Sequence, residues 1–318
     1  MGIHKWLSIA ITVAAFLCYV AYEISISNDG GGSIGHRELA YKDNIVSSSI
    51  KSGTRANKYF IVNAPIRFAT DIPAWTKHIE EAIADGSGDS NIGYTECASV
   101  IEIKGVYLCI SDKLSTMGKA LIRAELFIEA PFGLTPGNVV SIRSQEYLKA
   151  LTQFAGLDLN GSDLLAFWSA AKAACSENSD YCGSDAERVF FTDFVLPIST
   201  MGKPFVVIAY AIASPIDWRA TVTHEILHAQ YFLEKGFRTT VDDFWENHVS
   251  DKDKQLIRAA LGKDFNINDG SLVRNEFQAF ILMPDSDKTR LKLFVPTYRQ
   301  SLEAALTSND VPPLRVAN

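Results

Sequence analysis

The sequence predicts an α+β fold whose C-terminal half is mostly helical. In the first half of the 318-residue chain, β-branched and aromatic runs bounded by turn residues alternate with helical patterns, and such runs are typical of strands. After a continuously apolar run at Lys203–Ile212, apolar residues recur every three or four positions, which is typical of amphipathic helices. The hydrophobic content of 47% and the charged content of 21% are those of an ordinary globular protein.

The N-terminus departs from this composition. Trp6–Tyr22 contains no charged residue, follows His4 and Lys5, and precedes Glu23. A short charged region before an apolar region is typical of a signal peptide or a membrane anchor, and the charge bias puts the N-terminus in the cytoplasm. We therefore expect residues 1–23 to contact the membrane in one of these two ways. The rest of the chain is expected to be exported, either anchored on the extracytoplasmic side or secreted or periplasmic.

Residues 24–57 predict a flexible tether. They are rich in Ser, Gly, Asn and Lys, with Gly30-Gly31-Gly32 at their centre. Residues 58–318 are expected to form one folded domain, since no sharp boundary follows. The net charge of −7 and the lack of any run of Lys or Arg make nucleic acid a poor candidate partner.

The cysteines agree with export. Four of them lie outside the apolar N-terminal run, and an even number in an exported chain suggests two disulfides. The local pairing is Cys97 with Cys109, across a hairpin that turns near Lys104-Gly105, and Cys175 with Cys182, around a polar loop. The alternative is four reduced, partly buried thiols.

The elements that precede the long apolar run alternate between strand and helix patterns. They are a strand at Tyr59–Ala69, a helix at Pro73–Ala84, a hairpin of Ile92–Ile103 with Val106–Ile110, a strand at Leu121–Ile128, and helices at Ser144–Phe154 and Ser162–Cys175.

Lys203–Ile212 has the continuous apolar, β-branched composition of a buried strand. Ser214 then supplies a helix N-cap and Pro215 a first helical residue, so a helix is expected over Pro215–Lys235, ended by Gly236. The remaining helices are expected at Val241–Val249, Asp251–Leu261, Leu272–Met283, where Ser271 is the expected cap, and Lys288–Leu306.

The motif His224-Glu225-Ile226-Leu227-His228 lies in the middle of the helix expected at Pro215–Lys235. Side chains at positions i and i+4 lie on one face of a helix, so the two imidazoles can converge on one tetrahedral cation. Glu225 lies beside that face and can reach a water molecule on the open side of the metal. This is the known HExxH pattern of zinc metallopeptidases, and only six histidines occur in the chain.

A zinc ion needs a third protein ligand. The longer pattern HExxHxxGxxH is excluded, because Tyr231 and Glu234 stand where it needs Gly and His. Glu276 is favoured, since it lies in a later expected helix in which small Ala279 would allow two helices to approach closely. Glu246 and His248 are the alternatives.

HEILH followed by Asn-Glu-x-x-Ala at residues 275–279 resembles the gluzincin group of zincin metallopeptidases. The resemblance covers about residues 205–283. It implies a zincin-like catalytic domain that binds Zn²⁺ and hydrolyses a peptide or protein substrate. Carried over to this chain, His224, His228 and Glu276 are the metal ligands and Glu225 is the general base.

An oxyanion stabiliser is also expected at such a site. Tyr231 is favoured because it follows His228 by three positions on the same side of the helix. The other candidates are Tyr210, Arg274 and Tyr298. The expected function is zinc-dependent hydrolysis. The alternative is a catalytically inactive zincin-like domain that acts as an exported binding module.

Overall fold

The computed structural model describes residues 59–61, 77, 81, 95–151, 153–212, 218–262, 265, 267–284 and 289–316. These residues belong to one compact unit, Arg55–Asn318. The expected membrane segment, the expected tether, and the Ser214 and Pro215 helix start lie outside the described residues. None of the helices in the described ranges combines the length and the apolar content needed to cross a bilayer.

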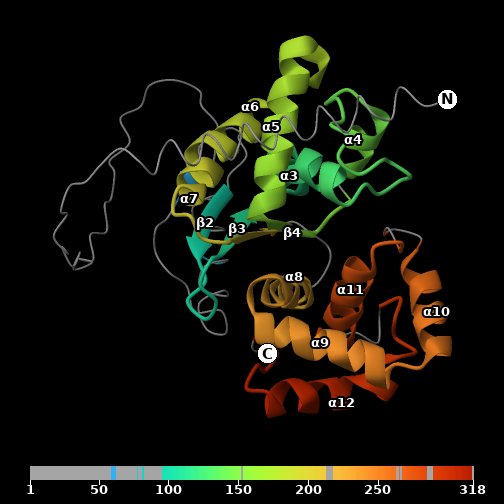
Figure 1. The fold of residues 1–318 in the computed structure, drawn as a ribbon. Helices are drawn as coiled ribbons and strands as arrows, with labels where there is room; N and C mark the ends of the chain where they lie inside the picture. Colours follow the sequence, from blue (N-terminus) through green and yellow to red (C-terminus); the bar gives the residue numbers. More distant parts are fainter. Residues whose placement is uncertain are drawn as a thin grey trace, which may run out of the picture. The chain divides into compact units, whose positions relative to one another are not determined.

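The unit has a mixed α+β fold (Figure 1). It is built on one five-stranded sheet with the strand order β1-β2-β3-β5-β4. The pairs β1–β2 and β3–β5 are parallel, whereas β2–β3 and β4–β5 are antiparallel. The strands are β1 (Tyr59–Ile61), β2 (Thr95–Ser99), β3 (Val106–Ser111), β4 (Gly156–Asn160) and β5 (Val206–Ala211).

Strand β5 is buried along its whole length, as predicted from the apolar run. Its side chains alternate between two clusters, because successive residues of a strand point to opposite faces of the sheet. Val207 packs in the cluster that the N-terminal helices form on one face. Ile208 packs against Val222 and Ile226 of the helix on the other face. Figure 1 shows helices on both sides of the strands.

The helices on the first face are α3 to α7. They are α3 (Leu114–Ile128), α4 (Gln145–Ala150), α5 (Gly161–Glu177), α6 (Asp185–Phe190) and α7 (Leu196–Ser199), with a 3₁₀ turn at Ser179–Tyr181 and a π-helical turn at Phe191–Val195.

The strand predicted at Leu121–Ile128 is wrong, because this segment is the second half of helix α3. Polar residues of this segment are buried because they pair with residues far away in the sequence, and a local sequence pattern does not reveal such pairs. Arg123 is 1% exposed and donates to Val140 O at 2.9 Å and to Glu187 Oε1 at 2.8 Å. Strand β4 and helices α6 and α7 were not predicted.

The helices of the C-terminal half occupy nearly the predicted segments. They are α8 (Trp218–Leu233), α9 (Lys235–His248), α10 (Asp251–Leu261), α11 (Gly270–Leu282) and α12 (Val295–Ser308).

Several predicted helix ends are wrong. Helix α9 begins at Lys235 rather than Val241, and helix α12 begins at Val295 rather than Lys288. Gly236 does not end α8 but lies in the first turn of α9. The last carbonyls of α8 are instead satisfied by Arg238, whose Nη1 donates to Tyr231 O at 3.2 Å and to Phe232 O at 3.0 Å. Helix α11 is capped by Asp269 rather than Ser271, since the aspartate accepts two backbone N–H groups of the first turn.

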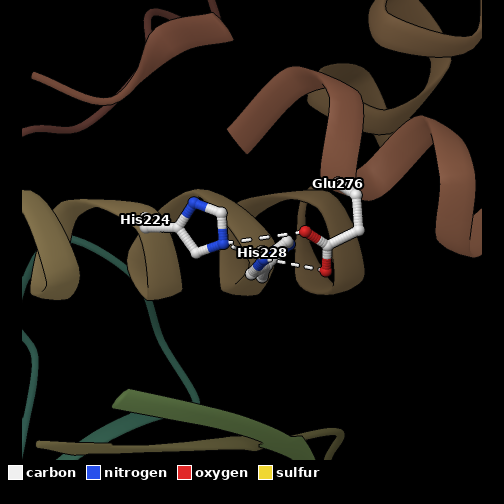
Figure 2. A group of neighbouring side chains, drawn as sticks. All are labelled: His224, His228 and Glu276. Atoms are coloured by element: carbon white, nitrogen blue, oxygen red, sulfur yellow. Dashed lines mark hydrogen bonds and ion pairs between the residues drawn. The ribbon is translucent and has the colours of Figure 1, made fainter. Parts of the chain in front are cut away.

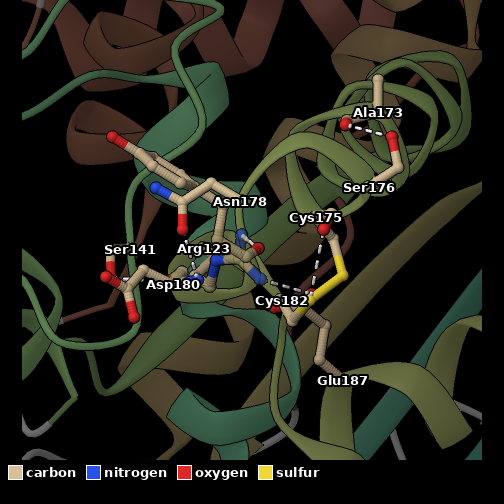
Figure 3. Close-up of a disulfide and its surroundings, with 10 residues drawn as sticks. Arg123, Ser141, Ala173, Cys175, Ser176, Asn178, Asp180, Cys182 and Glu187 are labelled. Carbon is tan, nitrogen blue, oxygen red and sulfur yellow. Dashed lines mark hydrogen bonds and ion pairs between the residues drawn. A yellow bond between two sulfur atoms is a disulfide. The ribbon is translucent and has the colours of Figure 1, made fainter.

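Both predicted disulfides are present. Cys97 and Cys109 face each other across the antiparallel pair β2–β3, with their Cα atoms 4.0 Å apart. Cys175 and Cys182 close the loop that follows α5 (Figure 3). That loop holds Arg123 in place, because Tyr181 O accepts a hydrogen bond from Arg123 Nη2 at 2.7 Å.

Removing the second disulfide is expected to destabilise the domain. Replacing both Cys175 and Cys182 with Ala should lower the free energy of unfolding by about 2–3 kcal/mol, because the unfolded chain regains the entropy of a short closed loop. Urea denaturation of the purified protein measures this loss as a lower midpoint. An unchanged midpoint, or free thiols at these positions in non-reducing peptide maps, would contradict a stabilising role.

Candidate metal centre

Helix α8 carries the two histidines on the side that turns away from the sheet. Val222 and Ile226 anchor its opposite side against β5 and β3. His224 and His228 therefore lie one turn apart, with their Nε2 atoms 3.0 Å from each other. His228 is 2% exposed. The sequence spacing thus places two imidazole nitrogens side by side in the interior.

Helix α11 brings Glu276 to the same point (Figure 2). Its Oε2 lies 3.7 Å from His224 Nε2 and its Oε1 lies 3.5 Å from His228 Nε2. The two helices are tied together by Gln278, whose Nε2 donates to Leu227 O at 3.1 Å. Ala279 is fully buried, in accord with the close helix approach expected at this residue.

The candidate ligand atoms lie close enough together to share one metal ion. The two Nε2 atoms are 3.0 Å apart, Glu276 Oε2 lies 3.7 Å from His224 Nε2, and Glu276 Oε1 lies 3.5 Å from His228 Nε2. Zinc ligands at 2.0–2.1 Å in a tetrahedral arrangement are about 3.3 Å apart. Two imidazoles and one carboxylate also form a set that leaves a fourth position open, as in catalytic zinc sites.

The electrostatics of the cluster fit a bound cation. Burial and the neighbouring His228 lower the pKa of His224 well below its ordinary value, and burial lowers that of His228, so both imidazoles are neutral at neutral pH, as metal ligands must be. Burial, followed by repulsion from Glu129 and Asp158, raises the pKa of Glu276 well above its ordinary value. Glu276 Oε2 is buried and has no hydrogen-bond partner among the described residues. A divalent cation would satisfy this oxygen and neutralise the carboxylate.

Glu225 lies beside this cluster without belonging to it. It points from α8 towards β4, where its carboxyl group hydrogen-bonds to that of Asp158. Ligand atoms of Asp158, Glu225 and His228 all lie within 4.8 Å of one another. Burial, then repulsion from Asp158 and Glu276, raises the pKa of Glu225 well above its ordinary value. The carboxyl group of Glu225 therefore lies next to the candidate metal ligands.

Gly156 allows this close approach of α8 to β4. A Cβ atom at this position would lie 2.6 Å from both Glu225 Oε1 and Thr221 Cγ2. Contacts this short are strongly repulsive, so a side chain here would displace the carboxylate. The backbone of β4 thus forms the wall against which Glu225 rests.

The sequence did not predict three further carboxyl groups around the centre, namely Glu125, Glu129 and Asp158. Burial is the main cause of their raised pKa values, which reach about 7 for Glu129 and about 8 for Asp158. Glu125 and Glu129 were not recognised because the segment at Leu121–Ile128 was predicted as a strand. Asp158 was not recognised because strand β4 was not predicted.

The alternative third ligands lie elsewhere. Glu246 has a side chain that is 61% exposed, and its Oε2 lies 3.4 Å from Lys254 Nζ. His248 stacks on the Phe244 ring at 5.2 Å. Neither belongs to a group of described residues that could share a metal ion.

Most of the oxyanion candidates are engaged in other contacts. The Tyr231 hydroxyl donates to Asp242 Oδ1 at 2.7 Å, and Arg274 Nε donates to the same oxygen. The Tyr298 hydroxyl donates to Asp253. Tyr210 is buried on β5 against α8. The role predicted for Tyr231 stays a prediction, since its hydroxyl would have to exchange its bond to Asp242 in order to act on a substrate.

No protein-family model, curated protein or solved structure matches this chain. What the site can do therefore follows from the chemistry of its own side chains. Two neutral imidazoles and a carboxylate can hold a metal, and a second carboxylate beside them can accept a proton from water.

Gly156→Ala is expected to lower the free energy of unfolding by about 1–3 kcal/mol, because the new methyl group overlaps the side chains of Glu225 and Thr221. Gly236→Ala is the matched control. There the new methyl group meets a single neighbour, Val311 Cγ1 at 3.1 Å, and Ala is favoured over Gly in a helix. Urea denaturation of both variants measures the difference, and equal stabilities would argue against a close approach at Gly156.

Proposed function

We propose that this chain is an exported zinc-dependent peptidase with a zincin-like catalytic domain of the gluzincin type. The observation that supports it most is the convergence of His224, His228 and Glu276 from two helices, with ligand atoms within 4.8 Å of one another. The HExxH motif and the later Asn-Glu-x-x-Ala segment supply the resemblance on which the peptide substrate rests.

The proposed metal ligands are His224, His228 and Glu276. Neutral imidazole with a carboxylate is a ligand set that suits zinc. Zinc held there would supply a coordinated water with a pKa of about 7 and would polarise the carbonyl group of a substrate.

Glu225 is the proposed general base. Its carboxylate accepts a proton from the attacking water and then donates that proton to the leaving amine. The position of Glu225 supports this role, because its carboxyl group has an oxygen within 4.8 Å of the ligand nitrogen of His228. Gly156 and Asp158 hold the carboxyl group towards the metal ligands from the side of β4.

Export is supported by the two disulfides, which are typical of oxidising compartments. The proposal leaves two forms of the exported protein, one anchored through residues 1–23 and one released as a secreted or periplasmic domain.

The purified protein is expected to bind about one equivalent of zinc. His224→Ala or His228→Ala should abolish binding, and Glu276→Ala should weaken it by at least about tenfold, since even outer-shell changes cost that much. Glu246→Ala is the matched control, because it removes an exposed carboxylate that lies beside Lys254. Elemental analysis and chelator competition measure both quantities. Loss of zinc in the Glu246 variant but not in the Glu276 variant would transfer the ligand role to Glu246.

Glu225→Gln is expected to keep zinc and fold but to lower peptide hydrolysis by at least about 100-fold, because the amide has the shape of the acid but cannot accept the proton. Digestion of a broad peptide library, followed by mass spectrometry, measures the loss. Unchanged cleavage by the Gln variant would mean that another group is the base. If the zinc-loaded wild-type protein cleaves no peptide, the inactive binding module becomes the better description.

A further inference from the structure

The segment that follows helix α12 runs along helix α8 and binds to it through its backbone. Gln230 Nε2 donates to Pro312 O at 3.2 Å, and Gln230 Oε1 accepts from Leu314 N at 2.8 Å. Thr223 Oγ1 accepts from Val316 N at 3.1 Å. The bonded backbone groups belong to alternate residues, as on one edge of an extended strand. Two side chains of α8 therefore hold an extended segment by its main chain.

Residues 312–316, which we call the strap, bind positions of α8 that flank the metal motif. Thr223 immediately precedes His224, and Gln230 follows His228 by two positions. The two anchors are seven positions apart, which is almost two helical turns, so both lie on one side of α8. Neighbouring positions of a helix are about 100° apart, so this side differs from the side that carries the histidines.

Apolar contacts hold the strap between α8 and the sheet. Val316 is 3% exposed and belongs to the same core cluster as Ile226 of α8 and Leu108 of β3. Leu314 packs against this cluster as well. The strap thus contacts both of the elements whose packing sets the rotation of α8.

The two anchors are polar side chains of the interior that depend on the strap. Thr223 is 0% exposed and Gln230 is 1% exposed. If the strap left α8, Thr223 Oγ1 and Gln230 Oε1 would lose these N–H donors, and water would have to enter beside the helix to replace them. The helix would also lose one of its supports against the sheet. Because the groups of a functional site must be held to within about 0.5 Å, even a small rotation of α8 would weaken metal binding.

We infer that docking of the strap and metal binding are coupled through α8, with Thr223 and Gln230 as the positioning residues that link them. The docked strap fixes the rotation of α8, and with it the distance of both histidines from Glu276 on α11. Coupling between two sites is reciprocal, so a bound metal ion tightens the docking of the strap by the same factor by which the strap tightens metal binding. The inference rests on the metal centre of the proposed function and not on peptide cleavage.

Zinc titration of full-length variants tests the inference. Thr223→Val keeps the shape of the side chain but removes the acceptor of the Val316 N–H group, and Gln230→Leu removes both of its bonds to the strap. Each should weaken zinc binding at least about fivefold, the lower end of common coupling between sites. Thr240→Val is the matched control and should keep the wild-type affinity, because it removes a buried hydroxyl of α9 that donates to Gly236 O at 3.0 Å. A loss of stability alone leaves the affinity unchanged as long as nearly all of the protein stays folded, which circular dichroism checks.

Hydrogen exchange of the wild-type protein gives a second measurement that needs no variant. Zinc should slow exchange of the Leu314 and Val316 amides at least about fivefold, because these amides exchange when the strap leaves α8. The slowing should level off once the metal site is full, whereas protection against global unfolding keeps growing with the zinc concentration.

The outcomes separate the inference from the proposed function. Wild-type zinc affinity in both strap variants overturns the inference alone, and so does exchange of the strap amides that zinc leaves unchanged or slows without levelling off. If the wild-type protein binds no zinc, the proposed function fails and the inference fails with it. If zinc binds and the strap responds but no peptide is cleaved, the peptidase proposal fails and the coupling stands.

Discussion

The burial of helix α8 between the sheet and helix α11 is the constraint on which the rest of the site depends. Val222 and Ile226 fix the rotation of the helix against the sheet, and Gln278 fixes its distance from α11. Because the rotation of α8 and its distance from α11 are fixed, the side chains of His224 and His228 face Glu276. The apolar contacts on one side of α8 therefore stabilise an arrangement of polar groups on the other side that would be costly by itself.

The fold follows from the sequence where local pattern and tertiary environment agree. The buried strand β5 and the helices of the C-terminal half were predicted because apolar periodicity determines them directly. Helix α3 was mistaken for a strand in its second half, because buried Arg123 pairs with Glu187, 64 positions away. The predicted end of α8 is wrong for a similar reason, since Arg238, rather than a glycine, satisfies the last carbonyl groups of the helix.

The candidate site was predictable only where spacing within one helix determines it. His224, Glu225 and His228 follow from a four-residue repeat, and Glu276 from the composition of a second helix. Asp158 and Glu129 could not be found in this way, because their relation to the motif depends on β4 lying against α8 and on the end of α3 reaching the pocket that Glu276 lines. No short sequence pattern reveals contacts between elements that are far apart in the chain.

The carboxyl groups gathered around α8 come from segments as far apart in sequence as Glu125 and Glu276. The unfolded chain keeps them apart and hydrated, so their burial side by side opposes folding. In the proposed metal site, metal binding and folding would therefore be linked through one free energy, as in other proteins whose ligands meet only in the native state. The concentration of available metal in the surrounding compartment would then set how much of the chain is folded, and so how long it survives proteases there.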